Sequence, residues 1–250
     1  MTFRPCALIP VFNHRRELGR LVATLRAEDL PVILVDDGSN PDTAAVLDRL
    51  GREETAVTLL RHDRNRGKGA AFLTGLEAAE NGGYTHVLQI DADGQHDPSQ
   101  AAVLLALARD EPAALVSGTP HYDASVPPIR YYGRWLTHLL VWLETGSRAL
   151  TDSMCGYRVY PVEATLQAFR TQSVGRRMDF DTEIMVRLYQ AGTPVRFTPV
   201  SVRYPHDGLS NFRLIRDNGR MTWLHLRLLA ALPPRQLRRL LRRRRGEQMP

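Results

Sequence analysis

The sequence predicts an α/β fold in which a mostly parallel sheet carries helices on both faces. Short apolar runs, several of them rich in β-branched residues, alternate along the first half of the chain with amphipathic stretches of helical period. The connections are short, and a run that is apolar at nearly every position is typical of a strand covered on both faces. We expect one large domain over residues 1–215 and a basic amphipathic helical tail over residues 216–250.

Five strands are expected before residue 120, with helices filling the gaps between them. The predicted strands are Cys6–Phe12, Val32–Asp37, Val57–His62, His86–Asp91 and Leu115–Gly118. The predicted helices are Glu17–Glu28, Asp42–Leu50, Gly69–Glu80 and Pro98–Ala108. Ser39 or Asn40 is suited to cap the second helix, and Pro98 suits the first turn of the fourth. This alternating order favours parallel pairing.

The pattern is looser after Gly118. An aromatic-rich helix is expected over Tyr131–Leu150, a loop and strand over Thr151–Tyr160, a helix over Asp181–Gln190 and a strand over Val195–Tyr204. A long amphipathic helix over Phe212–Ala231 should stop before Pro233, because proline lacks an N–H and clashes with the preceding turn.

Composition and charge narrow the function classes. From Arg216 onward ten arginines face two acidic residues, so the tail carries more than the whole net charge of +6 and the remainder is slightly acidic. The body is therefore not a basic surface for nucleic acid. Two cysteines are too few for a disulfide scaffold, and no leader or long apolar run is present, so we expect a cytoplasmic protein that is soluble or peripheral.

Polar residues follow four of the predicted strands, where ligands bind in open parallel sheets. The most specific segment is Asp91-Ala92-Asp93, because residues two apart in an extended chain can direct two carboxylates at one cation. Such oxygen ligands suit Mg²⁺ or Mn²⁺, and Gln95 would add an amide oxygen. A helix-capping turn is the alternative. A calcium loop of the EF-hand kind is excluded, since His96 stands where that loop needs glycine.

Two further strand ends carry groups suited to a nucleotide. Asp36 and Asp37 would accept hydrogen bonds from a base or a ribose, although a plain turn is the alternative. The segment Arg64–Gly69 offers cations and free N–H groups before a helix, which suits phosphate. It is not a Walker A loop, and a solvated basic turn remains the alternative.

Taken together, these segments resemble the family 2 glycosyltransferases of the GT-A fold, and among them the polyprenyl-phosphate mannosyltransferase branch. The resemblance spans residues 1 to about 215 and rests on five segments that occur in the family's order. They are Ile9–Asn13, Val35–Ser39, Asn65–Gly69, Gln89–His96 and Cys155–Arg158. It implies a Rossmann-like sheet and the inverting, metal-dependent transfer of a sugar from a UDP- or GDP-sugar to a polyprenyl-phosphate, another lipid-linked or a hydroxyl acceptor.

The resemblance also implies roles for single residues. The residues that would contact the nucleotide are Pro10, Phe12, Asn13, Asp36 or Asp37, and Lys68. Those that would serve the metal and the diphosphate are Asp91, Asp93 and Gln95. Asp152 is a catalytic candidate in the loop facing donor sugar and acceptor, where Arg158 would hold an anion. His206 or Arg213 would contact phosphate from a loop that closes over the diphosphate, although the match is looser there.

Asp181 is the candidate general base. In an inverting transfer to a hydroxyl, a carboxylate must remove the acceptor proton as the oxygen attacks. Asp179 and Glu183 compete for this role, and an acid-rich helix start is the alternative for all three. An acceptor that is already an ionised phosphate would need no base.

Two other functions and the tail complete the set of hypotheses. A nucleotidyltransferase would need a glycine-rich loop after the first strand, and Ile9–Asn13 lacks one. A non-catalytic nucleic-acid binder would need a basic, aromatic strand surface, so no nucleic-acid partner is expected.

The tail interleaves Leu with Arg and fits a helix on an anionic membrane, where each cation adds about 1 kcal/mol. A disordered end that aids solubility or is attracted to nucleic acid is the alternative for the tail.

Overall fold

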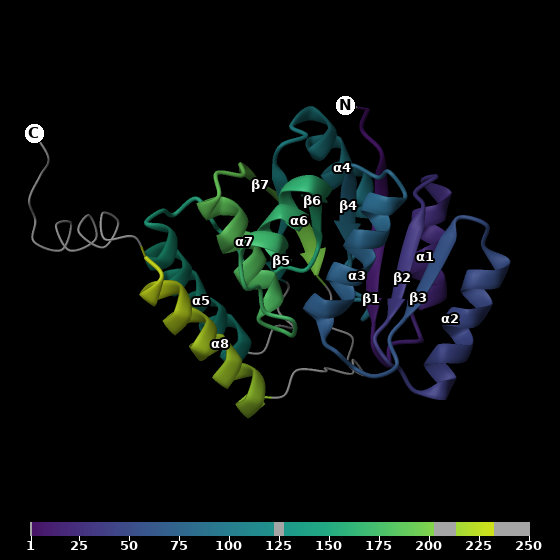
Figure 1. Ribbon diagram of the computed structural model, residues 1–250, viewed down its shortest axis with the longest axis horizontal. Coiled ribbons are helices and arrows are strands. Elements are labelled where there is room, and N and C mark those ends of the chain that lie inside the picture. Colours follow the sequence, from purple (N-terminus) through teal and green to yellow (C-terminus); the bar gives the residue numbers. More distant parts are fainter. Residues whose placement is uncertain (1, 123–127, 203–213, 233–250) are drawn as a thin grey trace, which may run out of the picture.

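The computed structural model describes residues 2–122, 128–202 and 214–232. Seven strands in these ranges form one sheet in the order β3-β2-β1-β4-β6-β5-β7 (Figure 1). The strands are β1 Pro5–Val11, β2 Val32–Asp36, β3 Val57–Arg61, β4 His86–Gln89, β5 Leu115–Tyr122, β6 Arg158–Pro161 and β7 Val195–Val202. The predicted parallel sheet is thereby confirmed, with one strand as an exception.

Strand β6 runs against its two neighbours, while all other neighbouring strands are parallel. Its first residue, Arg158, is in register with Gln89 of β4 and Ser117 of β5. Because β6 is reversed, the loop that precedes it lies at the edge where the parallel strands end. The reversal therefore brings residues 152–157 to the edge that also carries the loops after β1, β2 and β4.

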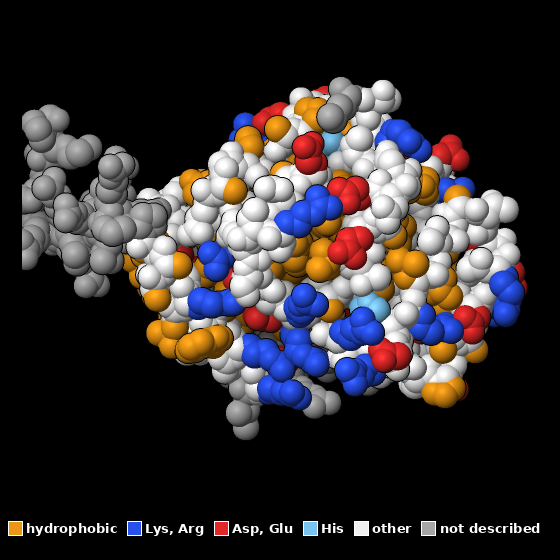
Figure 2. Space-filling view, in the orientation of Figure 1, with side chains coloured by type: hydrophobic (Ala, Val, Ile, Leu, Met, Phe, Trp, Pro, Cys, Tyr) orange, Lys and Arg blue, Asp and Glu red, His pale blue; other side chains and the backbone are white. Residues whose placement is uncertain are grey.

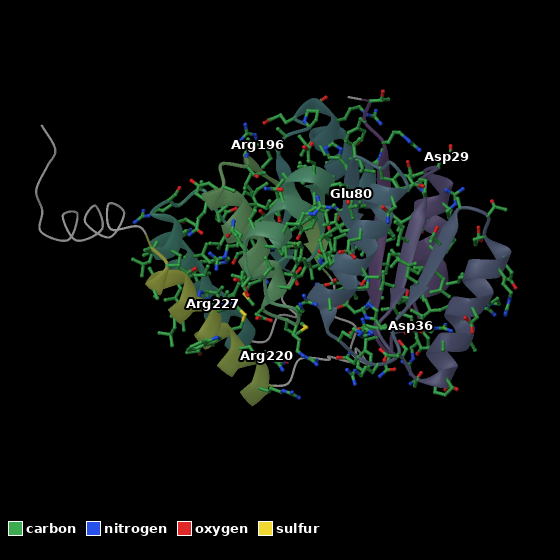
Figure 3. The ribbon with its side chains drawn as sticks, in the orientation of Figure 1. Asp29, Asp36, Glu80, Arg196, Arg220 and Arg227 are labelled. Atoms are coloured by element: carbon green, nitrogen blue, oxygen red, sulfur yellow. The ribbon has the colours of Figure 1, made fainter. Side chains whose placement is uncertain are left out.

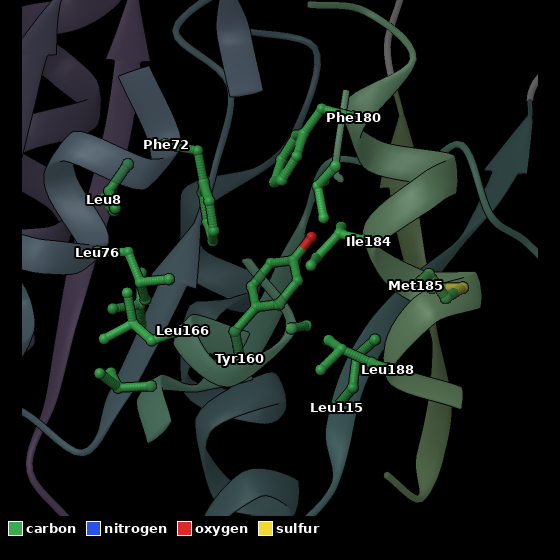
Figure 4. Packing of buried hydrophobic residues seen from close by; sticks show 14 of the residues in the cluster. Leu8, Phe72, Leu76, Leu115, Tyr160, Leu166, Phe180, Ile184, Met185 and Leu188 are labelled. Carbon is green, nitrogen blue, oxygen red and sulfur yellow. The ribbon is translucent and has the colours of Figure 1, made fainter. Parts of the chain in front are cut away.

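Helices cover both faces of the sheet, as the sequence predicts. One face carries α3 Lys68–Asn81, α5 Pro128–Thr145, α6 Val162–Thr171, α7 Phe180–Gln190 and α8 Leu214–Ala230, and the other carries α1 Leu18–Ala27, α2 Pro41–Glu53 and α4 Ala101–Asp110. Figure 4 shows the core of the first face, where the rings of Phe72, Tyr160 and Phe180 pack together. Leu18, Leu47 and Leu104 fill the second core.

Most predicted boundaries agree with the structure to within a few residues. Asn40 caps α2, its side chain accepting from the Thr43 N–H at 3.0 Å, and Pro98 begins a short 3₁₀ turn before α4. The helix expected to reach Leu150 ends at Thr145. Helix α6 is not predicted by the sequence pattern, because its start has no side-chain cap and it contains β-branched residues that favour strands.

Two expectations drawn from composition can be compared with the described residues. Cys6 and Cys155 are both free and buried, and burial raises the pKa of each thiol to about 12, so both are inert. Among the described helices, none combines the length and the apolar character that a membrane crossing requires. The basic end of the tail, residues 233–250, lies outside the described residues.

Candidate active site

The centre of the site is a lysine held between two aspartates. Lys68 Nζ lies 2.7 Å from Asp91 Oδ1 and 2.8 Å from Asp181 Oδ2. Lys68 is the first residue of α3, Asp91 follows β4 and Asp181 lies in the first turn of α7, so three distant segments meet here. Burial alone would lower the pKa of Lys68, but Asp181 and Asp91 together raise it far above its usual value. Lys68 is therefore a permanent cation.

Asp181 is fixed from three sides. Its second carboxylate oxygen, Oδ1, accepts from Gln89 Nε2 at 2.9 Å, and its backbone carbonyl accepts from Arg158 at 2.6 Å. The side chain is 9% exposed. Both carboxylate oxygens are thus already hydrogen-bonded to the protein, and Lys68 balances the charge. A general base needs a free carboxylate oxygen to take the proton, whereas both oxygens of Asp181 already have partners.

The two acids that compete with Asp181 have other partners. Glu183 is fully buried, accepts from the Gly175 N–H and pairs with Arg227 at 2.6 Å. Asp179 accepts from the Arg177 N–H. Of the three candidates, Asp181 alone contacts Lys68 among the described residues.

Asp91 and Asp93 form the candidate metal site. Burial and the neighbouring charge of Asp91 raise the pKa of Asp93 to about 6. Two close carboxylates whose charges repel each other favour a bound cation, and their oxygens are ligands that Mg²⁺ or Mn²⁺ prefers. The described residues contain no cluster of three or more His, Cys, Asp or Glu side chains suited to a metal. An ion would need oxygens from its ligand as well, which is how Mg²⁺ is usually held in phosphate sites.

The turn after Asp93 is shaped by the backbone. Gly94 adopts a φ of +73°, and the Gln95 N–H donates to Asp93 Oδ1 at 3.0 Å. Gln95 therefore supports the turn through its main chain. The role predicted for its side-chain oxygen as a metal ligand stays a prediction.

Two residues without a predicted role belong to this site. One is Gln89, a buried amide at the end of β4, whose side chain donates to Asp181. The other is Gly156, where a Cβ atom would lie 2.6 Å from Asp91 Oδ2 and 2.8 Å from Lys68 Nζ. Both residues lie within the segments that resemble family 2 glycosyltransferases. Beyond that resemblance, the only indication of a role for Gln89 is that it is a polar residue in a buried strand, where a polar group needs a hydrogen-bond partner.

Asp152 and Arg158 organise the loop between them. Asp152 accepts from the Met154 and Cys155 N–H groups and from Arg134 Nε at 2.6 Å, so it ties the loop to α5. Arg158 is fully buried and donates to the carbonyls of Ser153 and Asp181. The structure does not bring the guanidinium of Arg158 to a ligand-facing surface, in contrast to the anion-holding role expected for it.

Asp36 and Asp37 are nearly inaccessible and differ in their surroundings. Asp37 accepts from the Arg66 and Gly67 N–H groups and contacts His62 Nδ1 at 2.7 Å, so it holds the phosphate-type loop in place. Asp36 accepts from the Ser39 N–H and from Arg61, and it lines an open hollow of about 530 Å³ beyond β2 and β3. Figure 3 shows Asp36 at this edge of the sheet. Of the two, Asp36 alone lines this hollow, and the base contact expected for either residue stays a prediction.

The residues after β1 join the same edge. Asn13 has a φ of +59°, its side chain accepts from the Asn40 N–H at 2.8 Å, and its own N–H donates to Ser39 Oγ. Pro10 and Phe12 are half-buried beside it. His14, to which no role was assigned, lies within electrostatic reach of Asp91, although burial dominates and lowers its pKa. His206 and Arg213 fall outside the described residues.

Two proteins of named activity are similar to this chain in sequence. The chain is 27% identical to the undecaprenyl-phosphate mannosyltransferase of Micrococcus luteus over 79% of this chain and 83% of that protein. It is 26% identical to the UDP-N-acetylglucosamine--dolichyl-phosphate N-acetylglucosaminyltransferase of Methanococcus voltae, covering 72% of this chain and 77% of that one.

A solved structure shares the fold. Glucosyl-3-phosphoglycerate synthase from Mycobacterium tuberculosis, crystallised with Mn²⁺, UDP-glucose and glycerol 3-phosphate, superposes with a TM-score of 0.71. The match covers 93% of this chain and 82% of that one at 13% identity, which supports the GT-A architecture alone. The family model described as glycosyl transferase family 2 matches residues 6–174. Since that match covers more than half of the chain and includes every segment from β1 to α6, the protein belongs to glycosyl transferase family 2.

Proposed function

We propose that the protein is an inverting, metal-dependent glycosyltransferase that moves a sugar from a UDP- or GDP-sugar to a lipid-linked acceptor, with a polyprenyl phosphate as the acceptor class. The observation that carries this proposal is the placement of Lys68, Asp91 and Asp181 in contact at the edge where β1, β2 and β4 end. The relatives named above act on undecaprenyl and dolichyl phosphates, which supports the acceptor class.

Asp91 and Asp93 would hold Mg²⁺ or Mn²⁺ together with oxygens of the donor diphosphate. When bound, the ion supplies positive charge that stabilises the departing diphosphate. The raised pKa of Asp93 supports this assignment, because a carboxylate destabilised by its neighbour gains most from a nearby cation. The structural relative crystallised with Mn²⁺ and UDP-glucose is consistent with it.

The protein residues would position both substrates. An acceptor oxygen attacks the anomeric carbon from the face opposite the diphosphate, the new C–O bond forms, and the diphosphate leaves with the electron pair of the broken bond. Lys68 places a permanent positive charge beside Asp91. Asp181 orients Lys68 through their ion pair. Gln89 and Arg158 hold Asp181 in place by donating to its carboxylate and to its backbone carbonyl. An ionised phosphate acceptor needs no proton removed, so Asp181 acts here by positioning.

Donor binding is the direct test. UDP-, GDP- and dTDP-sugars are titrated into the protein with and without Mn²⁺, and the series is repeated with Asp93→Ala. We expect one nucleotide class to bind more tightly with Mn²⁺, and Asp93→Ala to lose that gain. Absence of metal-dependent binding for every nucleotide would overturn the proposal.

The acceptor is tested by a matched pair. Polyprenyl phosphate and the corresponding polyprenol differ only in the phosphate group. We expect sugar transfer to the phosphate and none to the alcohol, because the candidate base Asp181 already pairs with Lys68 and accepts from Gln89. Transfer to the alcohol at a comparable rate would reassign Asp181 as the general base.

We further propose that the protein works at the cytoplasmic face of a membrane, since a lipid acceptor is anchored there. Seven arginines and one glutamate among residues 233–250 give this end of the chain a strong positive charge. Such a charge is attracted to anionic headgroups.

A further inference from the structure

Helices α5 and α8 together expose an unusual apolar face. Nine large hydrophobic side chains are exposed among the described residues, and six of them lie on these two helices. The six, called here the apolar face, are Trp135, Leu136, Leu139, Leu143, Trp223 and Leu226. Trp223 is 67% exposed and Leu136 is 61% exposed. The four residues of α5 recur at intervals of three or four and form a stripe along that helix, and the two residues of α8, three positions apart, share one side of it.

The opposite sides of both helices are fully packed. Val141 of α5 and Leu224 and Leu228 of α8 are buried in the core that also contains Ile184. His225 Nδ1 lies 2.6 Å from Glu144 Oε1, which joins α8 to α5. Figure 1 shows the two helices side by side at one end of the molecule. The apolar face is therefore not part of the core, and large apolar side chains exposed on two adjoining helices mark an interaction surface.

A cationic hollow borders the apolar face. It has a volume of about 420 Å³ and lies between the segment before α7 and the first turns of α8. Its lining residues are Arg176, Arg177, Asp179, Arg216, Gly219, Arg220 and Trp223. Trp223 belongs to both the hollow and the apolar face, so the two surfaces are continuous. Figure 2 shows Lys and Arg side chains gathered on this face of the molecule.

Part of this positive charge is uncompensated. Arg220 pairs with Asp217, and Arg177 donates to Asn65 at 2.9 Å. For Arg176 and Arg216, no carboxylate partner occurs in the described part of the chain. With Asp179 in the lining and Asp217 paired to Arg220, the four guanidinium groups still leave a net positive charge, which suits phosphate groups.

We propose that the apolar face and its arginine hollow form a docking surface for an anionic lipid bilayer. Trp and Leu side chains would lie at the boundary between headgroups and acyl chains, and the arginines would contact lipid phosphates. A bilayer fits both halves of the surface at once, because tryptophan and leucine favour its interface and unpaired arginines complement its charge.

If the protein has the proposed function, the position of the hollow would let the docking surface bring a lipid acceptor to the active site. The carbonyl of Arg176 accepts from the Ala70 N–H at 3.1 Å, so the hollow adjoins the turn that begins with Lys68. A lipid phosphate would reach the site while its chain stays in the bilayer. Docking on the apolar face is nevertheless measurable without donor or acceptor.

Vesicle sedimentation with the full chain tests the proposal. Phosphatidylcholine vesicles are compared with vesicles containing one third phosphatidylglycerol. We expect strong binding to the anionic vesicles only, a loss of at least about tenfold for Trp223→Ser with Leu226→Ser, and a loss of about fivefold per cation for Arg176→Gln and Arg216→Gln. The matched controls Val103→Ser on α4 and Arg49→Gln on α2 are equally exposed and should bind normally.

Three results would overturn the inference. One is unchanged vesicle binding by the Trp223→Ser, Leu226→Ser variant. Another is binding that depends only on residues 233–250, shown by a chain ending at residue 232 that no longer binds although its apolar face is intact. The third is a lipid-free dimer in analytical ultracentrifugation that the same double variant dissociates, since the face would then be a subunit interface. Nucleotide-sugar binding is measured in parallel, so failure of docking and failure of the proposed transfer are separable.

Discussion

At the scale of single residues, Gly156 sets how closely the loop before β6 approaches the Lys68–Asp91 pair. A Cβ atom there would meet the ends of both side chains, which can move without unfolding the chain. We expect Gly156→Ala to fold normally and to lower kcat/KM for sugar transfer by one to two orders of magnitude, about the effect of displacing a reacting group by 1 Å. Gly19→Ala is the control, since nothing lies within 4 Å of that position. Full activity in Gly156→Ala would show that the contact is unimportant.

Asp93 carries a pH-dependent cost in the metal-free protein. Its pKa of about 6 exceeds the unfolded value of about 3.9, so the native state keeps a proton that the unfolded state releases. Stability therefore falls as pH rises from about 4 to 6, and the cost is fully present above pH 6. Asp93→Asn should raise the free energy of unfolding by about 1 to 2 kcal/mol at pH 7.5 and by less at pH 4.5.

Urea denaturation in the presence of a chelator measures this difference. Asp110→Asn changes an exposed carboxylate at the end of α4 and should alter stability little at either pH. An equal gain for Asp93→Asn at both pH values would contradict the assigned pKa. The Asp93→Asn variant should also lose metal-dependent donor binding. Such a gain in stability with a loss of function is expected where a functional site contains charges that repel each other.

At the scale of elements, the buried pair Glu144–His225 fastens α8 to α5. Glu144 is fully buried, and burial raises its pKa while the hydrogen bond from His225 opposes that change. His225→Ala would leave the carboxyl group without its partner and should cost about 3 kcal/mol. Adding Glu144→Gln should recover part of the loss, because a neutral amide is less costly to bury. Thermal unfolding of both variants decides, and an equal loss in each would show that packing dominates.

The sequence predicted the elements that are strongly patterned and missed those set by long-range pairing. The strands that end at Val11 and Asp36 are apolar at nearly every position, and Val87 and Leu88 give β4 an apolar centre, so these strands and the polar residues after them were predicted. The reversal of β6 depends on β4 and β5 as neighbours, which no local pattern encodes.

The same limit explains the site. The spacing of Asp91 and Asp93 is a local signal, whereas the contact of Lys68 with Asp181 joins residues 113 positions apart. Arg158 has the residue type of an anion ligand, and only its complete burial shows that it supports the backbone of Asp181 instead. Residue type thus indicated the chemistry of the candidate site, and topology decided which of its groups lie in contact.

At the scale of the whole molecule, the apolar face is attached to the catalytic sheet through one continuous core. Val141 and Leu224 share a cluster with Leu8 of β1, although the helices lie at one end of the molecule and β1 toward the other (Figure 1). A docking surface joined to the active site in this way would hold the site at a fixed distance from the bilayer. We therefore expect α8 to unfold cooperatively with the predicted domain of residues 1–215.

Cooperative unfolding of the helix pair with the sheet can be tested by tryptophan fluorescence. The three tryptophans of the chain, Trp135, Trp142 and Trp223, all lie on α5 and α8. Tryptophan fluorescence therefore reports on the helix pair, whereas far-ultraviolet circular dichroism reports on every helix and strand. If the chain unfolds as one cooperative unit, the two signals should give coincident urea midpoints and equal slopes. An earlier fluorescence midpoint would mean that α5 and α8 detach while the sheet stays folded. In that case the His225→Ala variant should widen the gap between the midpoints, since it weakens the joint between the two helices.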